Sequence, residues 1–273
     1  MGRRARAVLL VASGVLLGIS VYAGMIKAGL VRSPFAPVAA GDLKLARSNR
    51  SGVRVLFVGN SLTFKNDLPE LVHRLGGGRS PIFAGSFTAP GWQLRRFAGD
   101  DQLERLLHDV HWDVVVLQEQ SQIPSFSAGD RAHEFDPYVA QLADDVRRAG
   151  AQPLLFVTWA HRTGDRRNVK DDTYAWMQER VDAGYWNAAR KTRSALAPVG
   201  VAWAEALARR PQLNLWAADG THPSRAGSYL AACVFEALLT RRSPVGNAFR
   251  DGLDPALARF LQHVAWETAR KRY

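Results

Sequence analysis

Short apolar runs alternate with longer stretches of helical periodicity from residue 53 onward. The runs predict strands at 53–58, 82–87, 114–117, 154–159 and 200–203. The stretches between them predict helices, and Tyr138, Leu142 and Val146 trace the apolar face of one. Continuous apolar strands separated by helices are typical of a parallel sheet covered on both faces. The pattern therefore predicts an α/β fold: a three-layer α/β/α sandwich with a flavodoxin-like parallel sheet of about five strands.

Two helix starts carry local signals. Asp67, with Glu70 three residues later, is typical of a capping box and predicts a helix that runs through Leu75. Pro223 predicts the first position of another helix, because the fixed φ of proline suits the first turn.

The first 52 residues do not share this alternation. Residues 7–26 carry no charge and, as a helix, would be about 30 Å long, enough to cross a bilayer. Three arginines precede them, so the positive-inside rule places the rest of the chain outside the cytoplasm. We expect a membrane anchor or signal segment at 1–30, a linker at 31–52 and one domain at 53–273. Val21-Tyr22-Ala23 also resembles a cleavage site, and the alternative is therefore a secreted protein.

The net charge of +11 is concentrated at the ends of the chain. Residues 1–54 carry +8, and Arg270, Lys271 and Arg272 add three more, which leaves the body close to neutral. This distribution fits membrane topology and argues against nucleic-acid binding. Cys233 is the only cysteine, so an internal disulfide and a multi-cysteine metal site are excluded, and we expect Cys233 in the core.

A serine follows the first predicted strand in a tight turn, Val58-Gly59-Asn60-Ser61. Ligands of parallel sheets bind where strands end, so the Ser61 hydroxyl would face a cleft. An ordinary turn serine has the same appearance, and a nucleophile needs a base.

Asp219 and His222 supply a candidate acid and base near the C-terminus. A turn through Asp219-Gly220-Thr221-His222 would let the carboxylate orient one ring nitrogen while the other accepts the Ser61 proton. With Pro223 in the first helical position, His222 would lie at a helix N-terminus, which favours the neutral ring. The alternatives are a metal-ligand pair and a simple helix cap.

These residues resemble the conserved blocks of the SGNH/GDSL hydrolases. Gly59-Asn60-Ser61-Leu62 is similar to their Gly-Asp-Ser-Leu block, and Asp219-x-x-His222 is similar to their closing block. Gly91 matches the glycine of the second block. The resemblance implies an SGNH fold, a catalytic triad of Ser61, His222 and Asp219, and an oxyanion site formed by the amides of Ser61 and Gly91.

The third block departs from the family pattern. Where the family usually has Gly-x-Asn-Asp, this chain has Leu117-Gln118-Glu119-Gln120-Ser121. A glutamine amide can donate the hydrogen bond of the missing asparagine, so Gln118, or else Gln120, is expected to complete the oxyanion site. The run is typical of a divergent branch of the superfamily.

Other residues near predicted strand ends are candidates for substrate binding. His161 follows the fourth strand, and Trp92, Trp159 and Trp216 lie on loops of the cleft side, where they would stack on a sugar ring or pack in the core. The remaining histidines lack the spacing of a zinc site, and the Gly-x-Ser-x-Gly elbow of α/β-hydrolases is absent.

Together these features predict a serine esterase without cofactor or metal that removes an acyl group, acetyl in the first instance, from a carbohydrate or cell-envelope ester. The first alternative is a polysaccharide-binding or acyltransferase relative without hydrolysis, which the changed third block suggests. The second is a metal-dependent hydrolase with Asp219 and His222 as ligands. The expected partners are the ester substrate and, through the N-terminal helix, the membrane.

Overall fold

A computed structural model describes residues 38–41, 51–77 and 80–271. Six strands of this part form one sheet in the order β1-β3-β2-β4-β5-β6. Their bounds are β1 (Val38–Gly41), β2 (Val53–Gly59), β3 (Ile82–Thr88), β4 (Val114–Leu117), β5 (Gln152–Phe156) and β6 (Ala195–Ala197). The five strands from β3 to β6 are parallel, in the order of a flavodoxin-like sheet. The predicted sheet is confirmed.

The last predicted strand was wrong. Residues 200–203 lie inside helix α10 (Val199–Arg209), and the strand at this edge is β6, which pairs with β5 through Leu154↔Ala195 and Phe156↔Ala197. A short apolar run such as Gly200-Val201-Ala202-Trp203 suits a buried helix as well as a strand, so periodicity alone does not separate the two.

The other edge carries a strand within the predicted linker. β1 pairs antiparallel with β3, from Val38↔Thr88 to Gly41↔Gly85. The rest of the linker within 31–37 and 42–50, and the predicted anchor at 1–30, lie outside the described residues. Within the described part of the chain, no helix is both long and apolar enough to cross a bilayer.

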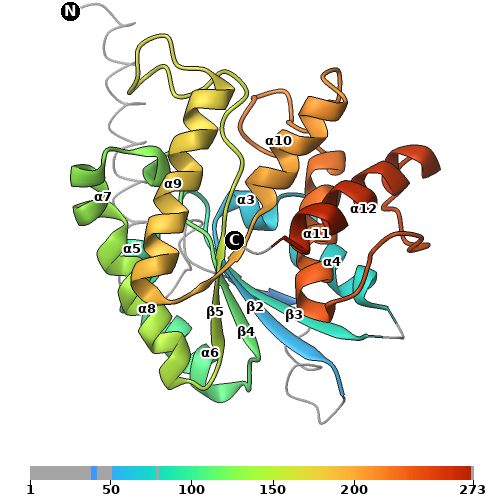
Figure 1. The fold of residues 1–273 in the computed structure, drawn as a ribbon. Coiled ribbons are helices and arrows are strands. Elements are labelled where there is room, and N and C mark those ends of the chain that lie inside the picture. Colours follow the sequence, from blue (N-terminus) through green and yellow to red (C-terminus); the bar gives the residue numbers. More distant parts are fainter. Residues whose placement is uncertain (1–37, 42–50, 78–79, 272–273) are drawn as a thin grey trace, which may run out of the picture. The chain divides into compact units, whose positions relative to one another are not determined.

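Helices cover both faces of the sheet (Figure 1). One face carries α4 (Leu68–Gly76), α10, α11 (Arg225–Thr240) and α12 (Pro255–Ala269), and the other carries α5 (Leu94–Phe97), α6 (Asp101–Asp109), α8 (Asp136–Arg148) and α9 (Tyr174–Thr192). Shorter elements are α3 (Ser61–Phe64), α7 (Ala128–Glu134), and the 3₁₀ turns η1 (Lys65–Asp67) and η2 (Ile123–Ser125).

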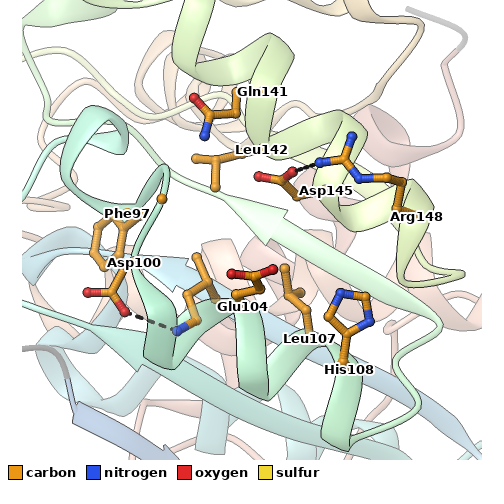
Figure 2. A pocket seen from close by; sticks show the side chains of 11 residues that line it. Phe97, Asp100, Glu104, Leu107, His108, Gln141, Leu142, Asp145 and Arg148 are labelled. Carbon is orange, nitrogen blue, oxygen red and sulfur yellow. Dashed lines mark hydrogen bonds and ion pairs between the residues drawn. The ribbon is translucent and has the colours of Figure 1, made fainter.

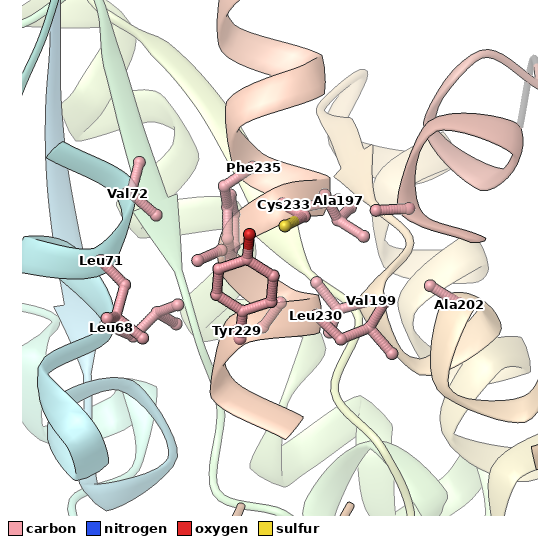
Figure 3. Close-up of a cluster of buried hydrophobic side chains, with 14 of the residues drawn as sticks. Leu68, Leu71, Val72, Ala197, Val199, Ala202, Tyr229, Leu230, Cys233 and Phe235 are labelled. Carbon is pink, nitrogen blue, oxygen red and sulfur yellow. The ribbon is translucent and has the colours of Figure 1, made fainter. Parts of the chain in front are cut away.

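The strand alternation sends neighbouring side chains into two separate cores. In β2, Val55 and Phe57 pack toward α4 and α11, while Leu56 and Val58 pack toward the other helices. Figure 3 shows part of the first core, where Cys233 of α11 lies among apolar side chains. Burial raises the pKa of the Cys233 thiol, as suits the core position expected for it.

Two predicted helix starts differ in detail. Asp67 precedes α4 in a left-handed conformation (φ 51°) and its side chain caps no backbone N–H, so the capping box does not form. Helix α11 begins at Arg225 with Ser224 as its N-cap, whereas Pro223 pairs with Trp216 in an isolated bridge. Pro223 is therefore not the first helical residue, and His222 lies in the loop before the cap.

Candidate functional site

The turn after β2 presents Ser61 at the carboxyl edge of the sheet. Asn60 is extended, and its side chain accepts the Leu62 N–H at 3.2 Å, which caps α3. Ser61 is the first residue of α3, so its own N–H has no acceptor within the helix. The turn thus places a hydroxyl and a free amide side by side.

A second loop brings His222 and Asp219 to Ser61. His222 Nε2 lies 2.9 Å from Ser61 Oγ, and His222 Nδ1 lies 2.7 Å from Asp219 Oδ2. With an ionised Asp219, both bonds are satisfied when the proton is on Nδ1, which leaves Nε2 to accept the Ser61 proton. Such a line of groups can activate a hydroxyl for nucleophilic attack.

The backbone of this loop keeps Asp219 ionised. Asp219 Oδ1 accepts the N–H groups of Thr221 and His222, both at 2.9 Å. Burial disfavours the charged form, but the hydrogen bonds from Thr221 and His222 outweigh it and lower the pKa of Asp219 to about 2. The carboxylate is therefore charged wherever His222 can act as a base.

Trp159, one of the predicted substrate-binding residues, and Asn66, which the sequence did not single out, hold the loop in place. Trp159 Nε1 donates to Thr221 O at 2.9 Å, and Asn66 Nδ2 donates to Pro223 O at 3.1 Å from the left-handed turn that follows α3. Asn66 thereby joins the Ser61 element to the His222 loop across 157 positions. No local sequence pattern marks such a long-range contact. Asparagine tolerates the left-handed conformation that Asn66 adopts here, at φ 56°.

Gly91 lies on the loop after β3, next to Trp92, whose carbonyl accepts Asn60 Nδ2 at 2.8 Å. It is exposed, it has φ +66°, and in the described residues no backbone carbonyl accepts its N–H. The positive φ favours glycine at this position. The amides of Gly91 and Ser61 are thus both available to a ligand.

The prediction that Gln118 completes the oxyanion site was wrong. Its side chain is fully buried, and Nε2 donates to Asn60 Oδ1 at 3.0 Å and to the carbonyl of Glu119. Its Oε1 accepts the Asn60 N–H and the Thr63 hydroxyl, both at 2.9 Å. Both donors of the amide are therefore occupied by protein.

Gln120 and His161 instead border a polar cavity beside the Asp219 loop. The cavity has a volume of about 470 Å³ and is lined mainly by polar groups from Gln120–Gln122, His161, Thr163–Arg167 and Asp219–Thr221. His161 Nε2 lies 2.9 Å from Ser121 Oγ, and burial lowers the pKa of His161, which favours the neutral ring. Gln120 Oε1 accepts the Gln122 N–H at 2.9 Å, whereas Nε2 makes only long contacts at 3.4 Å, so Nε2 can donate to a ligand.

The tryptophans do not line this cavity. Trp159 is fully buried and stacks on Trp203 at 4.2 Å, and Trp216 is 5% exposed with Nε1 bonded to Ala160 O. Substrate binding by Trp159 and Trp216 is therefore wrong, since both pack in the core. Trp92 is half-buried and its ring packs on Phe97 at 5.1 Å.

Phe64 is an exposed aromatic side chain that sequence reasoning missed. It is 38% exposed and lies three residues after Ser61 on α3, a spacing that places both side chains on one side of a helix. The spacing could have indicated it once α3 was recognised as helical.

A further cavity lies away from this site. It measures about 240 Å³ and lies between α6 and α8, with Glu104, His108 and Asp145 among its lining residues (Figure 2). Neither Ser61 nor His222 borders it. Among the described residues, no group of three or more His, Cys, Asp or Glu is placed to hold a metal ion.

The fold and the site together define a serine hydrolase with a flavodoxin-like sheet. No family model matches the sequence, and no curated protein matches it. Among solved structures, a protein from Slackia heliotrinireducens, described as a candidate SGNH hydrolase, is 30% identical with a TM-score of 0.57. The match covers 70% of this chain and 100% of that one. The chain belongs to the SGNH hydrolases, and it is an acyl hydrolase of the serine esterase type.

More distant structures share the fold. A DUF4886 family protein from Bacteroides uniformis is 20% identical, with a TM-score of 0.68 over 80% of this chain and 95% of that one. A lipase/acylhydrolase from Enterococcus faecalis is 14% identical, with a TM-score of 0.51 over 70% of this chain and 96% of that one.

Proposed function

We propose that the enzyme removes an acetyl group from a carbohydrate or cell-envelope ester with Ser61, His222 and Asp219 as its catalytic triad. The observation that carries the triad is the unbroken line of hydrogen bonds from Ser61 Oγ through His222 to Asp219. We also propose that the domain works outside the cytoplasm, anchored by the segment at 1–30 or secreted after its cleavage.

Acylation begins when Ser61 Oγ attacks the ester carbonyl and His222 Nε2 takes the hydroxyl proton. Asp219 stabilises the resulting imidazolium, and the carbonyl oxygen, now negative, accepts hydrogen bonds from the amides of Ser61 and Gly91. Gln120 Nε2, which makes only long contacts within the protein, is our candidate for a third donor. Collapse of the tetrahedral intermediate expels the alcohol, which takes the proton from His222. Water then repeats the sequence on the acyl-enzyme and releases the free acid.

The polar cavity supports a carbohydrate as the alcohol. Gln120, Ser121 and His161 offer amide, hydroxyl and imidazole groups next to Asp219, a lining suited to sugar hydroxyls rather than to a lipid chain. Loss of one such hydrogen bond costs about 0.5–1.5 kcal/mol, so Gln120→Ala or His161→Ala should raise KM for an acetylated oligosaccharide about two- to tenfold. KM for a small aryl acetate should stay within twofold.

Fluorophosphonate labelling tests the triad. Wild type and the surface variant Ser243→Ala should react covalently, whereas Ser61→Ala should not. Ser61→Ala and His222→Ala should each reduce kcat about a thousandfold or more, and the double variant should lose little beyond the single ones. Additive small losses would contradict a shared mechanism.

The same experiment separates the alternatives. A folded wild type that neither labels nor hydrolyses acetyl esters would favour a binding protein, a possibility that the occupied Gln118 amide keeps open. Transfer of the acetyl group to an added sugar faster than to water would identify an acyltransferase. Loss of activity after treatment with a metal chelator would favour a metal-dependent hydrolase.

A further inference from the structure

Gln118 connects β4 to the nucleophile turn. Its amide makes four hydrogen bonds, three of which go to Asn60 or Thr63 on either side of Ser61. The approach is so close that a Cβ on Gly59 would lie 2.5 Å from Gln118 Oε1. The side chain thus fixes the backbone that carries the Ser61 amide.

Glu119 makes the matching connection to the Gly91 loop. Its Oε1 accepts the Gln120 N–H at 2.6 Å and the Leu94 N–H at 3.1 Å, and Oε2 lies 3.2 Å from the same Leu94 nitrogen. The side chain is fully buried, and burial raises the pKa of Glu119 to about 8, although the N–H groups of Gln120 and Leu94 lower it. Protonation of Oε2 leaves Oε1 free to accept both N–H groups.

A third side chain, Asn60, connects the two loops directly, and we refer to Asn60, Gln118 and Glu119 together as the frame. Asn60 Nδ2 donates to Trp92 O at 2.8 Å, which ties the nucleophile turn directly to the loop that contains Gly91. Apolar side chains of that loop pack in the core, but two of its polar side-chain atoms contribute no hydrogen bond to it. Trp92 Nε1 and Gln93 Oε1 are buried and have no hydrogen-bond partner among the described residues. Beside the backbone bond from Ala89 N to Gly59 O, Asn60 and Glu119 supply the side-chain hydrogen bonds that this loop receives from the neighbouring strand ends.

We propose that Gln118 and Glu119 are positioning residues that hold the amides of Ser61 and Gly91 at the separation required to bind one oxyanion. In this chain the Gln118-Glu119 pair acts on the two backbone donors instead of supplying a donor itself. The inference rests on the oxyanion role of both amides in the proposed function. Because the frame is buried, an acceptor lost from it leaves N–H groups unpaired, which moves the loop rather than merely weakening one bond.

The test is a matched pair of variants at Glu119 in the full chain. Glu119→Gln keeps an accepting Oε1 and should retain kcat within about threefold. Glu119→Met has a similar length but no comparable acceptor, and should reduce kcat at least tenfold with KM within twofold, toward the hundredfold or greater loss of an oxyanion donor. Hydrogen exchange of residues 89–94 should accelerate in the Met variant alone. Glu236→Gln, on α11 on the other face of the sheet, is the control that should match wild type.

Two results would overturn the proposal: a folded Glu119→Met variant with wild-type kcat and exchange, or equal losses in the Gln and Met variants. If Glu119→Met does not fold, Asn60→Ser decides, because serine keeps a capping oxygen for α3 but cannot reach Trp92 O. Its loop should exchange faster, and unchanged exchange would refute the frame. An inactive wild type would refute the proposed function instead, while the exchange measurement would still decide the frame.

Discussion

Two carboxyl groups of the site have opposite ionisation behaviour because their surroundings differ. Asp219 is half exposed, with its side chain 52% accessible, and three hydrogen bonds from Thr221 and His222 stabilise its charge. Glu119 is fully buried, and this burial raises its pKa, while the charges of Arg95 and Glu134 act on it in opposite directions. One carboxyl is therefore suited to stabilising an imidazolium, and the other to accepting hydrogen bonds in the core.

The raised pKa of Glu119 predicts that the domain loses stability as the pH rises. In the unfolded chain the group ionises near pH 4.5, whereas in the folded protein its pKa is about 8. Its contribution is complete below pH 4.5 and declines up to pH 8 by about 1.4 kcal/mol per pH unit. Glu119→Gln should remove this decline from urea-unfolding free energies measured across that range.

Asp182→Asn provides the comparison for this prediction. Burial raises the pKa of Asp182 to about 7, so its contribution declines between about pH 4 and pH 7 and is constant above. Between pH 7 and pH 8 the unfolding free energy of Asp182→Asn should therefore still decline through Glu119, whereas that of Glu119→Gln should lack this decline. If the plot of unfolding free energy against pH for Glu119→Gln is parallel to that of wild type, Glu119 ionises normally in the folded protein.

At the scale of elements, one close contact orders the loop after β4. Helix α9 passes against η2, and a Cβ on Gly184 would lie 2.1 Å from Pro124 O. Arg180 of the same helix donates to Ser125 O at 3.2 Å and forms an ion pair with buried Asp172 at 2.7 Å. The segment from Gln120 to Ser125, which borders the polar cavity, is thus fixed by α9.

Gly184→Ala should destabilise the domain by about 1–3 kcal/mol, because the added methyl forces α9 away from η2. Alanine is otherwise the better helix former, so propensity alone predicts the opposite sign. Gly129→Ala in α7, where the nearest atom to the new Cβ is 3.8 Å away, is the matched control and should be neutral or stabilising by up to about 1 kcal/mol. The urea concentrations at half unfolding, compared at constant m-value, measure the stability of both variants. Equal shifts of the two midpoints from wild type would contradict the close contact at Gly184.

Sequence patterns were sufficient for the elements whose residues are locally distinctive. The β-branched runs at 53–58 and 114–117 match β2 and β4. The place of Ser61 directly after the first strand, together with the resemblance of Asp219-x-x-His222 to the closing block of the family, predicted the contact between Ser61 and His222. β6 is Ala195-Leu196-Ala197, which has little strand propensity, and it is ordered by pairing with β5. The orientation of the Gln118 side chain was equally inaccessible, because Asn60 and Thr63 determine it from 55 and more positions away.

At the scale of the whole molecule, β1 changes where the domain begins. The sequence predicted a domain from residue 53, but β1 covers the edge of β3 through four residue pairs. Removal of β1 would leave the backbone groups of β3 open to other chains, and a free edge strand promotes association. A chain that starts at Val38 keeps this edge covered, whereas one that starts at Gly52 does not.

We therefore expect the fragment 38–273 to be fully active, and the fragment 52–273 to unfold at lower temperature and to self-associate more than 38–273 does. The candidate site lies within residues 59–228, so both fragments should have the same kcat while folded. Thermal unfolding with size-exclusion chromatography makes the comparison. Equal stability of the two fragments would show that β1 contributes nothing to the sheet edge.

The full chain tests the N-terminal segment. It should sediment with membranes and resist extraction by salt if 1–30 is a retained anchor, whereas a soluble product with a new N-terminus after residue 23 would identify a cleaved signal.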